Sequence, residues 1–171
     1  ALDAGDMLAR ATRPIGDEET SDVVERDLAD LGARLLVETI DRIDAGQVTP
    51  QPQDDRLSTY APRLTKDEGI VEWTRPARAI HNRVRGLYPW PHAYAYLDGS
   101  RLILLKSRVL DDRVHPRPGE VVAVTRDAIE VATGHGTLAI EELQPEGRRP
   151  MRTRDFLAGR PIQPGAVFHG P

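Results

Sequence analysis

The apolar residues between Val24 and Ile43 recur in steps of three and four positions, with polar residues between them. This spacing predicts one amphipathic helix with a buried apolar face and a solvated acidic face. Thr20 is the expected N-cap, because its hydroxyl can accept a hydrogen bond from an unpaired backbone N–H of the first turn. Gly46 is expected to end the helix in the C′ position, where a left-handed backbone favours glycine.

A shorter helix is predicted between Thr74 and Gly86. Thr74 is its expected cap, and Pro76 fits the first turn, where a helix does not need the N–H that proline lacks. Pro89 and Pro91 cannot continue the helix, since neither can donate a backbone hydrogen bond. The apolar positions of this helix are Ala77, Ile80 and Val84.

Apolar runs of strand length follow. Asp98-Gly99 separates the runs 94–97 and 101–109, and an Asp-Gly pair in this setting is a strong signal for a β-hairpin. Further strands are predicted at 119–125, 128–133 and 137–143, because these runs are rich in β-branched residues and are separated by turn residues. Several short strands with close turns indicate a small barrel or sandwich.

The second strand of this hairpin carries two basic residues, Lys106 and Arg108, which alternation places on one face. Ile103, Leu105 and Val109 are expected on the other face, toward the core. Two interpretations of the basic face stay open: a solvated outer surface, or phosphate contacts along an RNA stem. Packing between the helix and the barrel, and stacking on bases, both stay open for Tyr88, Trp90, Tyr94 and Tyr96.

The segment from Val48 to Leu57 is rich in proline and acidic residues, which is typical of a linker. The charge balance changes across it: residues 1–66 hold 8 Lys and Arg against 14 Asp and Glu, whereas residues 67–171 hold 15 against 13. This asymmetry is either ordinary scatter or an adaptation of the second half to a polyanion. We expect three parts in an α+β chain: the end of one domain at 1–47, a linker at 48–66 and a mainly β domain at 67–171.

Bulk composition narrows the classes of function. With 171 residues, of which 39% are hydrophobic and 29% charged, the chain should be soluble and form one ordinary domain or two small ones. No apolar run approaches the length of a membrane span. The absence of Cys excludes disulfides, zinc–thiolate sites and Cys nucleophiles. A cytoplasmic protein is the simplest interpretation of a chain without Cys. The five histidines show no metal-ligand spacing, so we expect no metal.

Four stretches stand out together: Thr59-Tyr60-Ala61-Pro62 through Lys66, Ile70 to Trp73, Arg85-Gly86-Leu87, and Tyr88-Pro89-Trp90-Pro91. With these stretches the chain resembles the methionyl-tRNA formyltransferase family at the junction between that family's two domains. The resemblance implies the helix-rich tail of a Rossmann-like formyltransferase domain in 1–47, followed in 67–171 by a small OB-like β-barrel domain with one N-terminal helix. The chain starts at Ala1 without an initiator Met and looks like a cut through the first of these domains.

The segment from Leu2 to Met7 is similar to the one that carries the catalytic aspartate of the family, and Asp3 occupies that aspartate's position. Without the family, Asp3 is interpreted as a turn residue. The family implies that Asp3 is catalytic together with an Asn and a His that this chain does not contain, and that Leu2, Asp3 and Gly5 lie against 10-formyltetrahydrofolate, the formyl donor. The implied acceptor is the amino group of methionyl initiator tRNA, and the chain by itself is expected to be inactive.

The predicted contacts with tRNA are basic residues of the linker and the second domain. Two of them end the shorter helix and are expected to form one patch with the basic face of the hairpin. We expect a monomer, and two alternatives stay open: a non-catalytic RNA-binding module, and a related formyltransferase that acts on another amine. The candidate residues are Arg63, Lys66, Arg83, Arg85, Lys106, Arg108, Arg148, Arg149 and Arg152.

Overall fold

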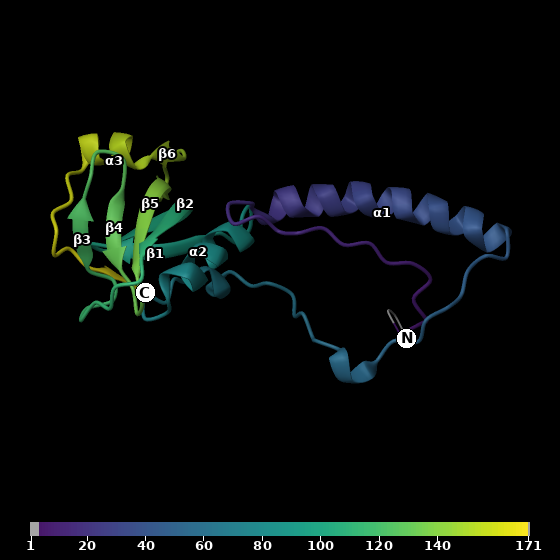
Figure 1. The fold of residues 1–171 in the computed structure, drawn as a ribbon. Helices are drawn as coiled ribbons and strands as arrows, with labels where there is room; N and C mark the ends of the chain where they lie inside the picture. Colours follow the sequence, from purple (N-terminus) through teal and green to yellow (C-terminus); the bar gives the residue numbers. More distant parts are fainter. Residues whose placement is uncertain (1–3, 171) are drawn as a thin grey trace. The chain divides into compact units, whose positions relative to one another are not determined.

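A computed structural model describes residues 4–170 (Figure 1). Contacts between residues divide the chain into two units, one that ends at Arg63 and one that begins at Leu64. The finer division into 1–47, 48–66 and 67–171 stays a prediction. Within residues 4–170, no helix combines the length and the apolar character that a membrane crossing would require.

The first unit contains the long helix α1, which runs from Ser21 to Asp44 as the apolar pattern predicted. Thr20 occupies the N-cap with an extended backbone, but its hydroxyl donates to the Asp22 carboxylate and caps no backbone N–H, so the predicted capping bond is wrong. Gly46 follows the helix with a positive φ of 67°, as the C′ position requires.

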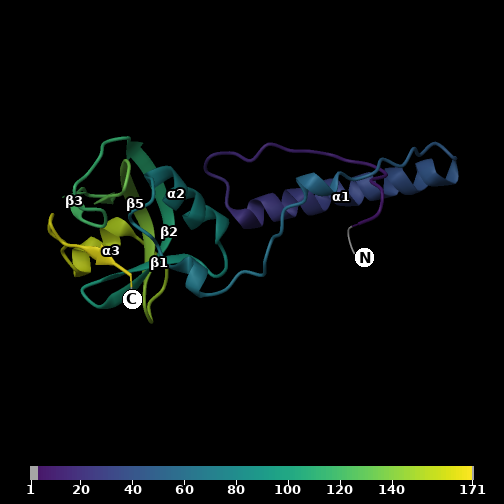
Figure 2. The same ribbon diagram turned by 90° about the horizontal axis from the view of Figure 1, so that it is seen from below.

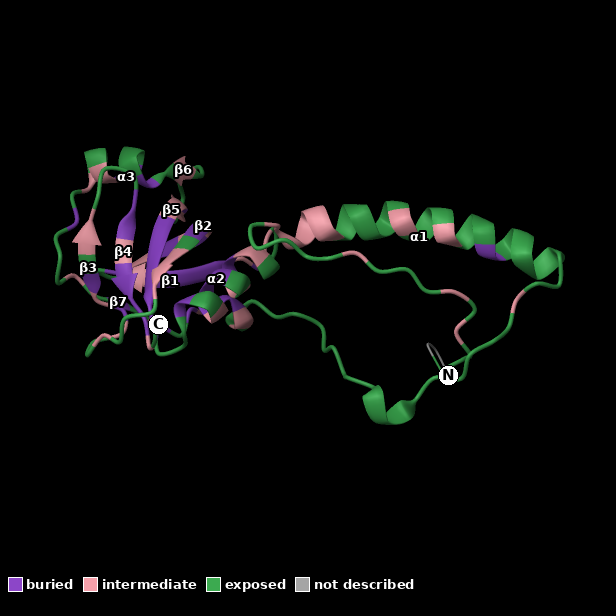
Figure 3. Cartoon of the chain, viewed as in Figure 1, coloured by how far each residue is buried: buried purple, intermediate pink, exposed green. Residues whose placement is uncertain are grey.

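The predicted apolar stripe of α1 is largely exposed within this unit (Figure 3). Leu36 and Ile40 are 61% and 54% exposed, and Thr39 is the one buried residue among those that the structure describes up to Arg63. Residues 4–63 therefore provide a helix with a hydrophobic face but form no core around it.

The second unit is built on an antiparallel sheet that curls into a barrel-like shape (Figures 1 and 2). Its strands follow the order β3-β4-β5-β2-β1-β7, and β6 pairs with β5. A bridge between Glu120 and Val167 joins the segment before β3 to the segment before β7, which brings the two edges of the sheet together. The strands are β1 (Ala93–Leu97), β2 (Ser100–Asp111), β3 (Val121–Val124), β4 (Ile129–Ala132), β5 (Thr137–Pro145), β6 (Met151–Arg152) and β7 (Phe168–His169).

The predicted hairpin is present. Asp98 and Gly99 both have positive φ, 48° and 73°, which is the backbone that a two-residue hairpin turn with the twist of its strands requires. The next strands, β3 to β5, lie within or near the predicted runs. The five predicted strands are therefore confirmed. The short strands β6 and β7 were not predicted.

One prediction about β2 is wrong because the ladder between β2 and β5 is irregular. Leu104 pairs with Leu143 and Lys106 with Glu142, so Leu105 is an extra residue on β2. This bulge resets the alternation of faces. Leu102 and Leu104 are fully buried, whereas Ile103, which was expected in the core, is only partly buried.

The helices of the second unit are the 3₁₀ helix η2 (Asp67–Gly69), α2 (Ala77–Gly86) and α3 (Thr153–Gly159). The predicted cap at Thr74 is wrong: α2 begins after Pro76, and the Ala77 N–H donates to the His135 carbonyl at 2.8 Å. The backbone of Thr74 lies instead against Gly134, where a Cβ atom would come within 1.8 Å of the Thr74 carbonyl oxygen. Pairing between these two loops, and not a side-chain cap, fixes where α2 starts.

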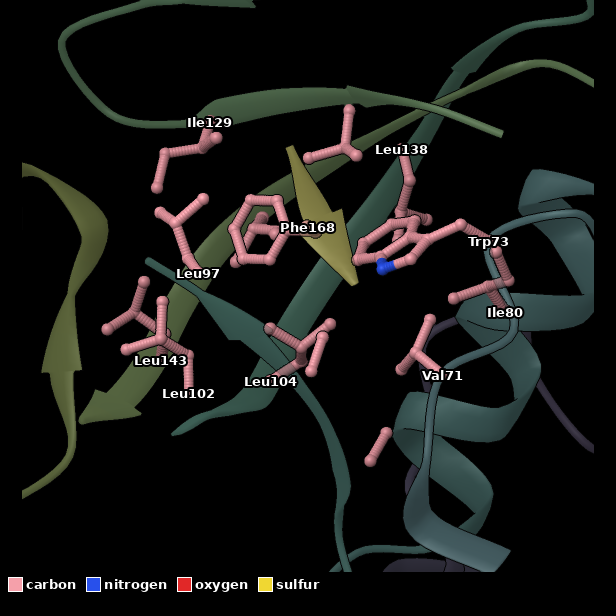
Figure 4. Packing of buried hydrophobic residues seen from close by; sticks show 14 of the residues in the cluster. Val71, Trp73, Ile80, Leu97, Leu102, Leu104, Ile129, Leu138, Leu143 and Phe168 are labelled. Carbon is pink, nitrogen blue, oxygen red and sulfur yellow. The ribbon is translucent and has the colours of Figure 1, made fainter. Parts of the chain in front are cut away.

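Apolar residues from α2 and the sheet form one core (Figure 4). The α2 stripe of Ala77, Ile80 and Val84 is buried, as predicted. Trp73 and Phe168 pack against each other with ring centroids 5.4 Å apart, which joins the segment before α2 to the last strand. The second unit therefore has the hydrophobic core that the first lacks.

We expect residues 64–171 to fold cooperatively when expressed alone, because this segment contains the whole core. A chain that ends at Arg63 should be largely unfolded, since α1 has nothing to cover its apolar face. Circular dichroism melts of the two segments test this. Limited proteolysis of the whole chain should cut first within 48–66, and a protease-resistant fragment that spans this segment would contradict the expectation.

Gly134→Ala should destabilise the second unit by at least about 1–3 kcal/mol, because the added methyl group meets backbone that cannot move away easily. Gly86→Ala is the matched control, since a Cβ atom there has no neighbour within 4 Å. It should change stability by no more than about 1 kcal/mol, on the stabilising side. Urea unfolding of both variants provides the comparison, and equal stabilities would show that the loop contact at Gly134 is unimportant.

Candidate nucleic-acid interface

Lys106 and Arg108 lie on the outer side of β2 and share one carboxylate. Glu141 lies 3.7 Å from the Lys106 ammonium and 3.0 Å from the Arg108 guanidinium. Glu141 reaches both because it is an extra residue on β5: Glu142 pairs with Lys106 and Ile140 with Ser107. The two cations remain more than half exposed, at 55% and 56%, so these ion pairs are weak and the cations stay accessible.

Arg152 extends the same surface across β6. Lys106 pairs with Glu142, and Glu142 pairs with Arg152, so the three residues form one row across β2, β5 and β6. We call this surface the β2–β5–β6 face. It carries two carboxylates against three cations, so its formal charge is close to neutral. The residues that define it are Lys106, Arg108, Glu141, Glu142 and Arg152.

The two arginines at the end of α2 both contact groups of their own unit, and their place in a common patch stays a prediction. The guanidinium of Arg83 donates to the backbone carbonyl of Glu68, and its Nε is buried without a partner in the described part of the chain. Arg83 therefore holds η2 against α2. Arg85 contacts Asn82 on its own helix, with Nη2 3.0 Å from the amide oxygen.

Arg148 and Arg149 are exposed in the turn between β5 and β6. Arg148 lines a cavity of about 640 Å³ beside α3, together with Arg160 and two acidic residues. Arg63 and Lys66 are exposed on either side of the boundary between the two units. These four residues are accessible to a ligand, and their contact with tRNA stays a prediction.

The predicted catalytic and folate-binding residues are described only in part. Leu2 and Asp3 lie outside the described residues. Gly5 is exposed, and its carbonyl accepts a hydrogen bond of 2.7 Å from the Gln53 side chain. A bridge between Met7 and Gln51 adds two backbone hydrogen bonds next to it. Within residues 4–170, no group of three or more His, Asp or Glu residues has a geometry that could hold a metal ion.

The aromatic residues of β1 and its neighbours show both packing and exposure. Tyr94 is buried beneath the Arg101 guanidinium, whose central carbon lies 4.0 Å from the ring centroid, so Tyr94 packs and is not a stacking surface. Trp90 is 50% exposed. The pKa of His92 is lowered by burial and by the nearby Arg101 charge, which keeps this imidazole neutral near pH 7.

Arg101 was not among the predicted site residues, although one signal for it was available. A residue two positions after a two-residue hairpin turn lies opposite the last outward residue of the preceding strand, which here is Tyr96. The position of His169 beside Tyr96 was not predicted, because the two residues are 73 positions apart in the sequence. His169 pairs with Tyr96 only through the contact between β7 and β1, and no local pattern indicates that contact.

Comparison with known proteins identifies this fold. The family described as "Formyl transferase, C-terminal domain" matches residues 63–161. The structure of HypX from Aquifex aeolicus in complex with tetrahydrofolic acid superimposes with a TM-score of 0.64 at 19% identity, over 91% of this chain and 28% of that one. At this identity the likeness shows the fold alone.

Relatives of higher identity extend the match beyond the second unit. The chain is 46% identical over 168 residues to a methionyl-tRNA formyltransferase from Citrifermentans bemidjiense, covering 98% of this chain and 52% of the relative. A methionyl-tRNA formyltransferase from Pelobacter propionicus is 44% identical over 169 residues, which are 99% of this chain and 52% of the relative. The chain thus spans about half the length of these relatives. Because the family match covers more than half of its residues, the chain belongs to the formyl transferase C-terminal domain family.

Proposed function

We propose that this chain is the C-terminal half of a methionyl-tRNA formyltransferase. The enzyme would transfer a formyl group from 10-formyltetrahydrofolate to the amino group of methionyl initiator tRNA. The observation that carries the proposal is the 46% identity to a relative of that name along 98% of the chain. HypX, which shares this fold, was crystallised in complex with tetrahydrofolic acid, and this supports a folate as the formyl donor.

In this proposal each of the three parts of the chain has a separate role. Residues 1–47 end a Rossmann-like catalytic domain, 48–66 link the domains, and 67–171 form an OB-like barrel that binds tRNA. The exposed apolar face of α1 supports the first assignment, because such a face is stable only when another part of a domain covers it. The barrel-like sheet supports the third.

The proposed chemistry needs a carboxylate near the reacting atoms. Attack of the amine on the formyl carbon makes the nitrogen cationic and places negative charge on the formyl oxygen. Asp3 would orient and stabilise a cationic histidine from the other half of the enzyme, and Leu2 and Gly5 would lie against the folate. This reaction needs a base and oxyanion donors, so we propose that it proceeds without a metal. Because tRNA is cytoplasmic, we also propose a cytoplasmic enzyme, and a monomer.

For tRNA binding we favour the β2–β5–β6 face over the end of α2. Lys106 and Arg108 are more than half exposed, and Arg152 lies in the same row. The guanidinium of Arg83 is committed to the Glu68 carbonyl, so Arg83 is the least suitable of the candidates. Arg63, Lys66, Arg85, Arg148 and Arg149 stay proposed contacts of secondary weight.

In the whole enzyme, Asp3→Asn should lower kcat by about 10²-fold or more, because the amide keeps the shape but loses the charge that stabilises a cationic partner. The KM for tRNA should change little. Asp6→Asn is the matched control, since Asp6 is exposed three positions along the same segment and should leave kcat unchanged. Steady-state formylation assays decide, and near-normal turnover of the Asp3 variant would make Asp3 a turn residue only.

Replacing both Lys106 and Arg108 with Ala should weaken tRNA binding. The slope of the logarithm of the binding constant against the logarithm of the salt concentration should become shallower by about 1–2. The double replacement should raise the KM for tRNA but leave single-turnover formylation at saturation nearly intact, because binding and not transition-state stabilisation is lost. The control replaces Arg117 and Arg126, two exposed arginines outside the face, and should leave both quantities unchanged.

A second variant is expected to change tRNA binding in the opposite direction. Glu141→Gln removes the carboxylate that both cations share, so it should tighten tRNA binding and steepen the salt dependence. If neither variant changes the slope, the face is a solvated surface and Arg148 and Arg149 become the next candidates. A non-catalytic RNA-binding module would show the affinity changes without formyl transfer in the whole protein, and a related formyltransferase would transfer the formyl group to another amine.

A further inference from the structure

The outer side of β1 carries two tyrosines. Ala93, Ala95 and Leu97 are fully buried in the core, so alternation directs Tyr94 and Tyr96 away from it. Both neighbouring strands add a polar residue beside Tyr96.

Arg101 of β2 and His169 of β7 each pair directly with Tyr96, one on either side. Directly paired residues of adjacent strands project to the same side of the sheet. Three strands thus place a tyrosine between an arginine and a histidine on one surface.

The rings on this surface are arranged as a supported platform. The Tyr96 and His169 rings are nearly parallel, with 14° between their planes and 6.1 Å between their centroids. Tyr94 meets Tyr96 edge-on at 78°, also with centroids 6.1 Å apart, and is itself covered by Arg101. The buried Tyr94 therefore restrains the Tyr96 ring from one side.

Exposure separates the residues that support this platform from those that can receive a ligand. Tyr94 is 7% exposed and can only support. Tyr96 is half-buried and His169 is exposed, so their rings are accessible. The His169 Nδ1 lies 2.5 Å from the Gly170 carbonyl, which fixes the orientation of the imidazole. Arg101 is half-buried, and its guanidinium lies over Tyr94 beside the two accessible rings.

We propose that Tyr96 and His169 form a stacking platform for an unpaired base of the bound RNA, with Arg101 placed to contact the adjoining phosphate. This inference rests on the proposed function, because it assumes that the protein binds tRNA. Every base has a flat π face, so two nearly parallel rings suit an unpaired nucleotide without selecting its sequence. The donors of an arginine and a histidine beside the rings match a phosphate and base edges better than they match an apolar protein surface.

This contact would differ in kind from those of the β2–β5–β6 face. Stacking releases no counterions, so its loss should lower affinity without changing the salt dependence. Removing Lys106 and Arg108, in contrast, should change that dependence. The two contributions can therefore be measured separately in one protein.

The test uses the whole protein and two RNA hairpins that share one stem. One hairpin carries a short single-stranded 3′ extension that contains 2-aminopurine, and the other ends in the paired stem. Tyr96→Ala should weaken binding of the extended hairpin by about 5- to 100-fold, with an unchanged salt slope. It should leave the blunt hairpin unaffected and abolish the quenching of 2-aminopurine on binding.

Tyr96→Phe keeps the ring and should bind like the parent, which separates stacking from loss of fold. His169→Ala should reproduce part of the Tyr96→Ala effect, whereas Tyr60→Ala, at a tyrosine 91% exposed outside the platform, should have none. Circular dichroism melts monitor folding of each variant.

The inference is overturned if Tyr96→Ala binds the extended hairpin as tightly as the parent, or weakens both hairpins equally. If the Lys106 and Arg108 variant still loses affinity in that case, the proposed function stands and only the platform fails. If the parent protein binds neither hairpin nor tRNA, both proposals fail.

Discussion

The pairing of β2 with β5 decides which side chains of the second unit enter the core and which face outward. The ladder has three irregularities, of which the first makes Leu105 an extra residue on β2 and the second makes Glu141 an extra residue on β5. The first irregularity lets Leu104 and Ser107 both be buried although they are three positions apart. The second places a carboxylate between the two exposed cations of β2. Removing either bulge would exchange the two faces of the strand beyond that point.

The outer surface of β1 depends on closure of the sheet by the end of the chain. Phe168 of β7 is buried against Trp73, and this apolar contact fixes the register in which β7 meets β1. Because neighbours on a strand alternate between faces, burial of Phe168 directs His169 outward beside Tyr96. A core contact thus determines the composition of the outer surface. The same logic applies at Gly134, where close contact of two loops sets the first residue of α2.

Local patterns predicted what local physics determines. The periodic apolar stripes of α1 and α2, the Asp98-Gly99 turn and the runs of β1 to β5 were all readable, because each depends on residues close in sequence. The errors concern long-range geometry. Alternation placed Ile103 in the core because a bulge has no sequence signature, and Thr74 appeared to be a cap because its contact with Gly134 is tertiary. The hydrogen bond from Arg83 to the Glu68 carbonyl is likewise tertiary, and no side-chain pattern indicates it.

With electrostatic attraction alone, this unit would bind RNA weakly. The β2–β5–β6 face holds three cations and two carboxylates, and residues 67–171 carry only two more basic than acidic residues. Long-range attraction is therefore small, and ion pairs with Glu141 must be exchanged for phosphate contacts before Lys106 and Arg108 contribute. A protein with so little excess charge gains most from contacts that do not depend on charge. Aromatic stacking on Tyr96 and His169 is such a contact, and its loss would be felt equally at low and high salt. In the proposed function the near-neutral face and the aromatic platform would be complementary: the first would orient the RNA through a few local phosphates, and the second would add affinity where the bases are unpaired.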